Sequence, residues 1–302
     1  MVNLSTKVGN IDLEHPVMNA SGILGSEPEH MTALAKLGFA ALVSKTFTVE
    51  PREGYSPPIV IELRNGGFLN AVGLANPGLR GIRPVVEKAR ELRLPIIVSI
   101  GGSRLEEFIK LVEEAESSGA NAVELNLSCP HVKGHGLEIG QDPSQVYAVV
   151  KEVKSTSRIP VVVKLGLSDK LLESAGKALE AGADALTLIN TVRALAIDVY
   201  ALKPLLTNVY GGLSGPPIHP IAVRAVYDVF REYMADIIAS GGVSSWMDVA
   251  EFIIAGARAV QIGSYIAKNE RIVQEILEGL HNWLEDLNIR NLKEVVGIAH
   301  RR

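Results

Sequence analysis

Short apolar segments alternate with longer amphipathic segments along most of the chain. The apolar segments have the length of strands, and the amphipathic ones place apolar residues at the three- and four-residue spacing of helices. The predicted strands are residues 17–20, 40–45, 96–100, 122–127, 160–164, 185–189, 236–239 and 259–262. The predicted helices are residues 29–37, 81–92, 105–117, 143–156, 170–181, 221–234, 246–255 and 271–287. Because eight strand–helix units close a parallel barrel, the pattern predicts an α/β protein with the (β/α)8 fold, the TIM barrel.

Three segments lie outside this alternation. An N-terminal β-hairpin is predicted over residues 4–13, with Gly9-Asn10 at its turn. Long loops are predicted after strands 2 and 6, at residues 46–79 and 191–220, and loops beyond ~15 residues in a compact domain are usually functional. No charge run or linker-like stretch divides the sequence, so we expect residues 1–302 to form a single domain.

Composition and charge exclude several classes of protein. The net charge of −4 and the scattered Lys and Arg residues give no basic stripe for nucleic acid. No apolar run approaches the ~18 residues of a membrane span, and residues 1–16 lack the apolar core of a signal peptide. The single cysteine, Cys129, excludes internal disulfides and is typical of a reducing compartment. We therefore expect a cytoplasmic protein that binds neither membranes nor nucleic acid.

Polar residues and glycines follow every predicted strand. In a barrel these positions converge on one face, which holds the active site. Two of them, Lys45 and Lys164, end apolar segments, and burying a lysine without a partner costs several kcal/mol. The two lysines therefore indicate an anionic ligand. The strand-end residues are Ser21-Gly22, Lys45-Thr46, Ser99, Asn126 with Cys129, Lys164, Asn190-Thr191, Gly241-Gly242 and Gly263-Ser264.

Two of these glycine-containing pairs follow the last two strands. Gly241-Gly242 and Gly263-Ser264 are one strand–helix unit apart, at the place where barrels commonly bind phosphate with backbone N–H groups. Glycine lets the backbone approach an oxyanion closely. The pattern favours a phosphate site, which serves either a substrate or a cofactor such as flavin mononucleotide (FMN).

Amides and the thiol supply further candidate chemistry. Asn70, Asn126 and Asn190, together with Thr191, offer donors and acceptors to a planar polar ligand. An unpaired cysteine is more often an inert core residue than a reactive group. Cys129 directly follows a strand that alternates apolar and polar residues, and a role as nucleophile or base becomes the better interpretation only together with the other strand-end residues.

The histidines after Cys129 do not predict a metal site. His131 and His135 are four residues apart, but Gly134 and Gly136 disfavour a helix there, and no third ligand is near apart from Cys129. Gly134, Gly136 and Gly140 instead suit a mobile lid that carries Cys129 over the site.

These motifs together resemble the dihydroorotate dehydrogenases, flavin enzymes of pyrimidine synthesis, over nearly the whole chain. The NAD-linked class 1B branch is more similar than the fumarate-linked class 1A branch, and the quinone-linked class 2 branch, which uses serine as its base, is less similar still. The motifs are Asn19-Ala20-Ser21-Gly22, Lys45-Thr46, Asn70-Ala71-Val72-Gly73-Leu74, Asn126-Leu127-Ser128-Cys129-Pro130, Val163-Lys164, Asn190-Thr191, Gly211-Gly212-Leu213-Ser214-Gly215, Ser240-Gly241-Gly242 and Gly263-Ser264.

The resemblance implies a role for each matching position. Cys129 is expected to remove the C5 proton of dihydroorotate while hydride leaves C6 for FMN, with Lys45 and Lys164 as the other catalytic residues. Substrate contacts are expected from Lys45, Asn70, Ala71, Val72, Gly73, Leu74, Asn126, Asn190 and Thr191. FMN contacts are expected from Ala20, Ser21, Lys45, Thr46, Ser99, Asn126, Lys164, Ile189, Gly215, Gly241, Gly242, Gly263 and Ser264.

Two positions depart from the family pattern. His131 stands where relatives carry an asparagine, which removes one expected contact to the substrate ring and places a titratable group beside the base. Ser99 also replaces an asparagine, which shortens the reach of one expected hydrogen bond to the flavin.

The resemblance also implies partners. We expect a homodimer and, as in class 1B, a second subunit carrying FAD and an iron–sulfur cluster. One cysteine cannot hold such a cluster, and the chain lacks a dinucleotide-binding glycine fingerprint. Two other functions stay open from the residues alone: a flavin-free barrel isomerase or synthase acting on a phosphorylated substrate, and a non-catalytic barrel scaffold.

Overall fold

The computed structural model describes residues 2–128 and 137–301, without the side chains of residues 137 and 138. Its centre is a parallel sheet of eight strands in the order β3-β16-β15-β10-β9-β8-β7-β4. The strands are β3 (Val17–Asn19), β4 (Leu42–Val43), β7 (Ile96–Ile100), β8 (Ala122–Leu127), β9 (Val161–Leu165), β10 (Ala185–Leu188), β15 (Ile237–Ser240) and β16 (Ala259–Ile262). All eight predicted strands are present.

The sheet closes into a barrel between β3 and β4. The backbone N–H of Ala40 donates to the carbonyl of Val17 at 3.0 Å. The Asn19 side chain completes the join, because its amide oxygen accepts from the N–H of Val43 at 2.9 Å and its Nδ2 donates to the Val43 carbonyl at 2.8 Å. An asparagine side chain therefore replaces part of the backbone ladder at the seam, and the predicted TIM barrel is confirmed.

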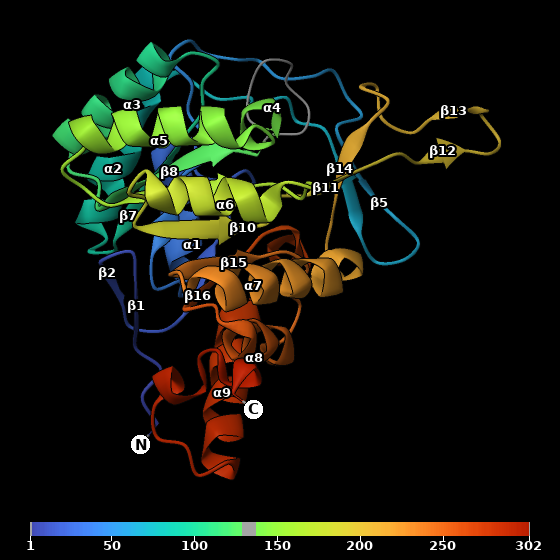
Figure 1. Cartoon of the computed structure of the whole chain (residues 1–302). Helices are drawn as coiled ribbons and strands as arrows, with labels where there is room; N and C mark the ends of the chain where they lie inside the picture. The colour runs from blue at the N-terminus through green and yellow to red at the C-terminus, as the bar shows by residue number, and fades with distance from the viewer. Residues whose placement is uncertain (1, 129–136, 302) are drawn as a thin grey trace.

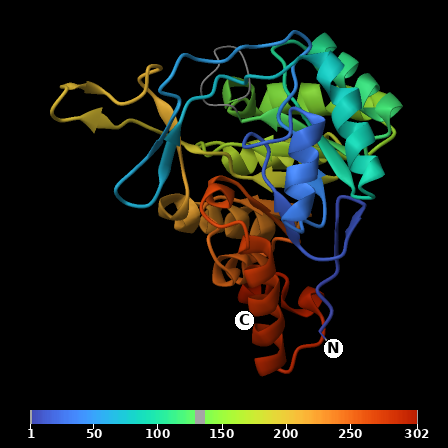
Figure 2. The same cartoon turned by 180° about the vertical axis from the view of Figure 1, so that it is seen from behind.

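Helices surround the barrel, one after most strands (Figures 1 and 2). Each contributes buried apolar residues to the main core, and several end at a glycine with positive φ, as α3 does at Gly119 with φ of 91°. The α-helices are α1 (Pro28–Lys36), α2 (Ile82–Glu91), α3 (Leu105–Ser118), α4 (Leu137–Gly140), α5 (Pro143–Thr156), α6 (Leu171–Glu180), α7 (His219–Tyr233), α8 (Trp246–Ala255) and α9 (Ile272–Asp286). Short 3-10 helices are η1 (Leu79–Gly81), η2 (Pro216–Ile218), η3 (Ser264–Ala267), η4 (Leu292–Val295) and η5 (Ile298–His300).

The predicted N-terminal hairpin is confirmed as β1 (Thr6–Val8) paired with β2 (Ile11–Leu13). Its apolar residues Val8, Ile11 and Leu13 join a cluster with inward-facing residues of the barrel strands, among them Met18 and Ile238. The hairpin lies at the amino ends of the strands, on the side opposite the long connections (Figure 1). It therefore plugs that end of the barrel and leaves the carboxyl ends for the site.

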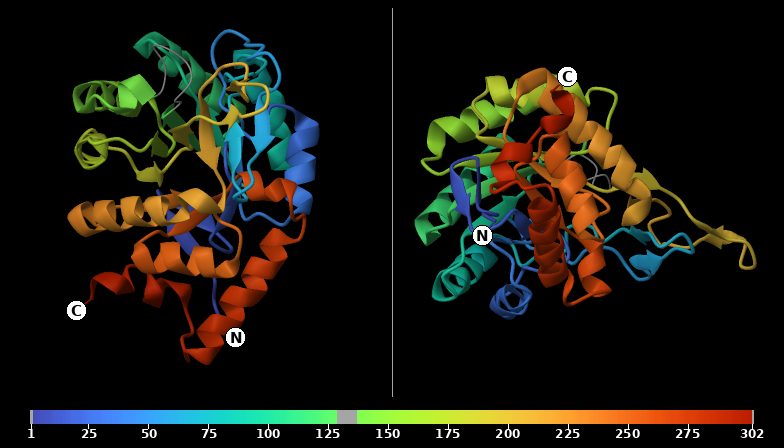
Figure 3. Two further views of the ribbon diagram at one scale, coloured as in Figure 1. Left: turned by 90° about the vertical axis from the view of Figure 1, so that its right-hand side faces the viewer. Right: turned by 90° about the horizontal axis from the view of Figure 1, so that it is seen from below.

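The two long connections are not structureless, which the sequence analysis did not foresee. They contain β5 (Val60–Glu62), β6 (Phe68–Asn70), β11 (Val192–Ala194) and β14 (Gly211–Ser214), which form one antiparallel sheet in the order β11-β14-β6-β5. A second pair, β12 (Ile197–Asp198) with β13 (Lys203–Pro204), forms a hairpin that projects away from the barrel (Figure 3). The pairing of β6 with β14 joins residues about 140 positions apart and leaves no local signal. The pairs β5–β6 and β12–β13 are local hairpins, but their strands have only two or three residues each, too few to show a periodic pattern.

No helix within residues 2–128 and 137–301 combines the length and the apolar character needed to cross a membrane.

Candidate active site

The carboxyl ends of the barrel strands surround one cavity of about 460 Å³. This volume lies within the range of pockets that hold cofactors and small substrates. The antiparallel sheet stands beside the mouth and adds Phe68, Asn70 and Ser214 to the wall. Most of the predicted site residues line this cavity: Ala20, Ser21, Lys45, Thr46, Asn70, Val72, Gly73, Leu74, Asn126, Lys164, Ile189, Asn190, Thr191, Gly215, Gly241, Gly242, Gly263 and Ser264.

Two described residues of the predicted site are not among those that line the cavity, and a third predicted residue is not described. Ala71 is 1% exposed and packs with Leu69 and Leu206 in a small cluster behind the antiparallel sheet. Ser99 is fully buried, and its hydroxyl lies behind Thr46, 3.0 Å from Thr46 Oγ1. Cys129 lies outside the described residues, as do His131 and His135.

The cavity wall also contains residues that the sequence analysis did not assign. Phe68 and Asn70 are two residues apart on β6, so a strand there would have placed both on one face. Gly22, Ser214 and Ser240 belong to motifs quoted above but had no expected contact. The remaining unassigned residues are apolar, so their residue types did not indicate a site. The unassigned residues are Gly22, Ile23, Ile59, Val60, Phe68, Ser214, Ile218, Ser240, Val243 and Ala267.

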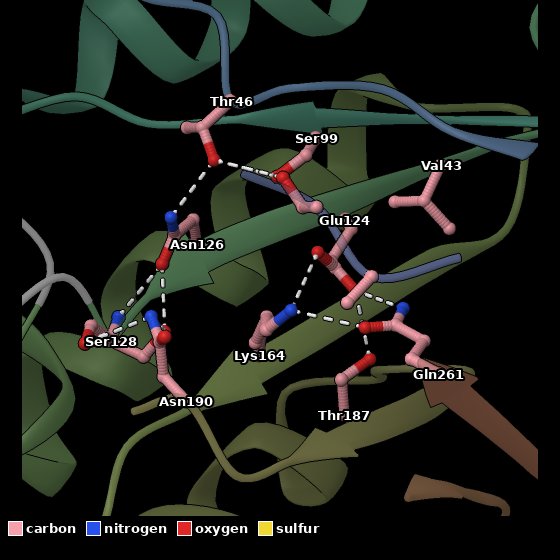
Figure 4. Close-up of polar contacts among 12 residues, drawn as sticks. Val43, Thr46, Ser99, Glu124, Asn126, Ser128, Lys164, Thr187, Asn190 and Gln261 are labelled. Atoms are coloured by element: carbon pink, nitrogen blue, oxygen red, sulfur yellow. Dashed lines mark hydrogen bonds and ion pairs between the residues drawn. The ribbon is translucent and has the colours of Figure 1, made fainter. Parts of the chain in front are cut away.

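A hydrogen-bonded network crosses the cavity wall at the ends of the strands (Figure 4). Asn126 Nδ2 donates to Thr46 Oγ1 at 2.9 Å, and Asn126 Oδ1 accepts from the hydroxyl of Ser128 at 2.7 Å. Asn190 Nδ2 donates to the same Ser128 hydroxyl at 2.9 Å. The network fixes Ser128, the last described residue before Cys129.

The three asparagines all have hydrogen-bond partners within the protein. Asn126 and Asn190 are joined through Ser128, and Asn70 Nδ2 donates to the Gly212 carbonyl at 3.2 Å. All three residues also line the cavity. They are prearranged for a ligand rather than dependent on one.

Lys164 belongs to a charged cluster inside the barrel (Figure 4). Its ammonium donates to Gln261 Oε1 at 3.0 Å and lies 3.6 Å from Glu124 Oε1. Glu124 is fully buried, and its other oxygen accepts from Thr187 Oγ1 at 3.0 Å and from Gln261 Nε2 at 2.9 Å. The alternation seen in residues 122–127 thus has its polar side toward the barrel interior, where Glu124 supplies the counter-charge that the sequence analysis attributed to a ligand.

Lys45 differs from Lys164 because no acidic group of the described residues lies within ion-pair distance of its ammonium. Partial burial lowers the pKa of Lys45, since the charged form loses hydration. A partly buried ammonium group on a cavity wall, with no acidic partner nearby, is a binding position for an anion.

Backbone N–H groups supply a second candidate anion position in the same cavity. Gly241, Gly242, Gly263 and Ser264 line the cavity, and their N–H groups have no backbone acceptor in the described part of the chain. Gly242 has φ of 77°, and a Cβ there would lie 2.7 Å from His219. We call these four N–H groups the anion cradle. Free N–H groups converging from two loops are what a phosphate needs, so these residues fit the phosphate of FMN.

The fold and the site define a barrel enzyme that binds an anionic, nucleotide-sized ligand at the carboxyl ends of its strands. Comparison with known proteins is more specific. The family model for dihydroorotate dehydrogenase matches residues 3–284. The chain therefore belongs to the dihydroorotate dehydrogenase family, whose members are FMN-dependent oxidoreductases that oxidise dihydroorotate in pyrimidine biosynthesis, and the sequence-based assignment is confirmed.

Individual relatives carry names from two branches. A protein of Aeropyrum pernix named putative dihydroorotate dehydrogenase A (fumarate) is 50% identical, over 99% of this chain and 98% of its own. A protein of Pyrococcus furiosus named dihydroorotate dehydrogenase B (NAD(+)), catalytic subunit, is 44% identical, over 99% of this chain and 100% of its own.

A solved structure matches the fold. The crystal structure of DHODH from Eimeria tenella in complex with ferulenol superposes with a TM-score of 0.86, covers 99% of this chain and 89% of that chain, and is 24% identical in sequence.

Proposed function

We propose that the protein oxidises dihydroorotate to orotate with FMN held in the cavity. The observation that carries this proposal is the presence of two anion positions in one cavity, the anion cradle and Lys45. FMN and dihydroorotate each carry an anionic group, a phosphate and a carboxylate. Family membership supplies the identity of the two ligands.

Residues for FMN come from the strand ends. The anion cradle and Gly215 would hold the phosphate, and Ser21, Thr46 and Asn126 would bind the ring system. Bound FMN supplies the acceptor for the hydride that leaves C6 of the substrate. Lys164 would place a positive charge beside the ring, where a preorganised charge stabilises the negative charge that develops during reduction.

Residues for the substrate come mainly from the other wall. The Lys45 ammonium would bind the carboxylate, while Asn70, Asn126 and Asn190 would bind the ring through the hydrogen-bonding capacity that their mutual network leaves free. Cys129 would take the C5 proton as its thiolate. Its predecessor Ser128 is held by Asn126 and Asn190, which supports a fixed starting point for the segment that carries the thiol.

We further propose that the protein acts in the cytoplasm as a homodimer and passes electrons to a second subunit carrying FAD and an iron–sulfur cluster. The single cysteine supports a separate cluster-bearing subunit, since such clusters usually need four thiolates. Two relatives are named as catalytic subunits, which supports a separate subunit for electron transfer. Assays with NAD, fumarate and a quinone side by side, with and without co-purified protein, test the acceptor.

The central test is spectroscopic. The purified full chain is expected to be yellow, and anaerobic dihydroorotate is expected to bleach the flavin absorbance in one turnover. A colourless protein that FMN does not reconstitute would favour the flavin-free barrel. A yellow protein that dihydroorotate does not bleach would favour the non-catalytic barrel.

A further inference from the structure

We infer that His219 is a positioning residue for the anion cradle, orienting the Gly242 N–H toward the cavity and so setting the affinity for the phosphate of the flavin. The inference rests on the proposed binding of FMN. His219 begins α7, behind the loop that follows β15, and only 10% of its side chain is exposed.

The first step is the hydrogen bond between the ring and the loop. His219 Nδ1 lies 3.1 Å from the carbonyl oxygen of Gly241. A carbonyl oxygen only accepts, so Nδ1 carries the proton and donates.

The second step follows from peptide geometry. The Gly241 carbonyl and the Gly242 N–H belong to one peptide group, and this bond is not among the cis bonds of the chain. In a trans peptide the C=O and N–H point in opposite directions. Because His219 holds the carbonyl from the α7 side, the Gly242 N–H points away from α7. Gly242 lines the cavity, and its N–H has no backbone acceptor in the described part of the chain.

The third step is that the ring itself is fixed. His219 Nε2 lies 3.0 Å from Glu251 Oε2 and 3.6 Å from Asp248 Oδ1, both on α8. The ring edge also contacts Phe252, with 4.8 Å between ring centroids. The His219 ring is therefore in contact at both nitrogens and with the Phe252 ring, as a positioning group requires.

Asp248 also fixes the far end of the loop formed by residues 241–245. Asp248 Oδ2 accepts from the N–H groups of Ser244 and Ser245, each at 2.8 Å. The loop 241–245 is thus tied at its start through His219 and at its end through Asp248. Rotation of the Gly241–Gly242 peptide, which two glycines would otherwise permit, is opposed mainly by the His219 bond.

The test compares FMN with riboflavin, which has the same ring system and no phosphate. The full chain is stripped of flavin, and both dissociation constants are measured by flavin fluorescence for wild type, His219→Leu and His219→Asn. Leucine and asparagine have similar size, but Asn Nδ2 can donate in place of Nδ1. His281→Leu, at a half-buried position of α9 far along the chain from the loop 241–245, is the matched control.

His219→Leu is expected to weaken FMN binding about tenfold or more, the usual value of a hydrogen bond to a charged group, with riboflavin changed less than about twofold. His219→Asn is expected to keep FMN affinity within about threefold of wild type. Equal weakening of both ligands by His219→Leu, no weakening, or failure of His219→Asn to rescue would each overturn the inference. Should His219→Leu not fold, His219→Ala against His219→Asn gives the same comparison. A wild-type chain that binds neither flavin would instead refute the proposed function.

Discussion

At the scale of single residues, the expected chemistry concentrates on Cys129. A free thiol has a pKa of about 8.5, so a few per cent is thiolate at neutral pH and the rate is expected to rise with pH. Cys129→Ala is expected to lower dihydroorotate oxidation by several powers of ten while bound flavin is retained, and Cys129→Ser to be slower than wild type but active. Stopped-flow flavin reduction measures this step. Near-full turnover by the alanine variant would exclude Cys129 as the base.

The charge of Lys45 is expected to strengthen substrate binding and to lower the stability of the folded protein. Burial lowers its pKa in the folded protein, so the unfolded chain binds more protons in the pH range between the lowered and the ordinary lysine value. The cost of the buried charge is complete below that range and disappears as pH rises through it.

Lys45→Met is therefore expected to raise the free energy of unfolding of the ligand-free protein at pH 7, with a gain that shrinks at alkaline pH. The same variant is expected to raise the KM for dihydroorotate about tenfold or more, because a charge-assisted bond to the carboxylate is lost. Urea titrations at several pH values and steady-state kinetics check both signs. A variant that is less stable at pH 7 and keeps its KM would contradict the account.

Glu124 compensates the charge of Lys164 where water cannot. Side-chain exposure of the two is 0% and 4%. Glu124→Gln leaves the ammonium with the neutral amides and is expected to lower the free energy of unfolding by about 3–5 kcal/mol, the usual cost of breaking a buried pair. Adding Lys164→Met removes the orphaned charge and is expected to recover much of that loss.

Urea denaturation of the single and double variants forms the cycle that measures this coupling. Glu180→Gln, which breaks the exposed pair with Lys177, is the control and is expected to cost at most about 1 kcal/mol. Additive losses in the double variant would show that the two charges do not depend on each other.

At the scale of elements, the antiparallel sheet positions one wall of the site. β14 pairs with β6 so that Gly212 lies opposite Asn70, and Gly211 allows the close approach. A Cβ on Gly211 would lie 2.5 Å from Leu206 Cδ1 and 2.9 Å from the Asn70 carbonyl oxygen. The sheet therefore depends on glycine at this position.

Gly211→Ala is expected to displace β6, and with it Asn70 and Phe68, raising the KM for dihydroorotate several-fold. The overpacking cost of about 1–3 kcal/mol falls on the sheet rather than on the barrel, so flavin content is expected to stay near wild type. Leu202→Ala, on the projecting hairpin where Leu202 is 85% exposed, is the control. An unchanged KM in Gly211→Ala would argue against this wall as the substrate side.

At the scale of the whole molecule, the cavity draws on strands from around the barrel, from Ala20 after β3 to Ile189 after β10 and Gly263 after β16. A ligand that contacts all of them binds only the closed barrel. FMN at about one hundred times its dissociation constant is thus expected to raise the free energy of unfolding by about 2.7 kcal/mol. Thermal melts with increasing FMN measure this shift, and melts insensitive to FMN would count against a site in the barrel.

Local sequence patterns were enough to predict the barrel and most of the residues that line its cavity. These patterns are local signals: the periodicity of strands and helices, the glycines after helices and the polar residues after strands. Each depends only on residues that are close together in the sequence. That is why eight strands, the N-terminal hairpin and the strand-end positions from Ser21 to Ser264 could be predicted before any fold was known.

The hydrogen-bond and ion-pair partners of the polar groups could not be predicted in this way, because they depend on the three-dimensional fold. Glu124, Lys164 and Gln261 lie on three different strands, and their contacts exist because the barrel brings the inward faces of those strands together. The antiparallel sheet likewise pairs Asn70 with Gly212, far along the chain. Ala71 and Ser99 lie behind the cavity wall for the same reason. Local patterns specify which side of a strand is polar. Closure of the barrel determines which side chains on the other strands form hydrogen bonds and ion pairs with that side.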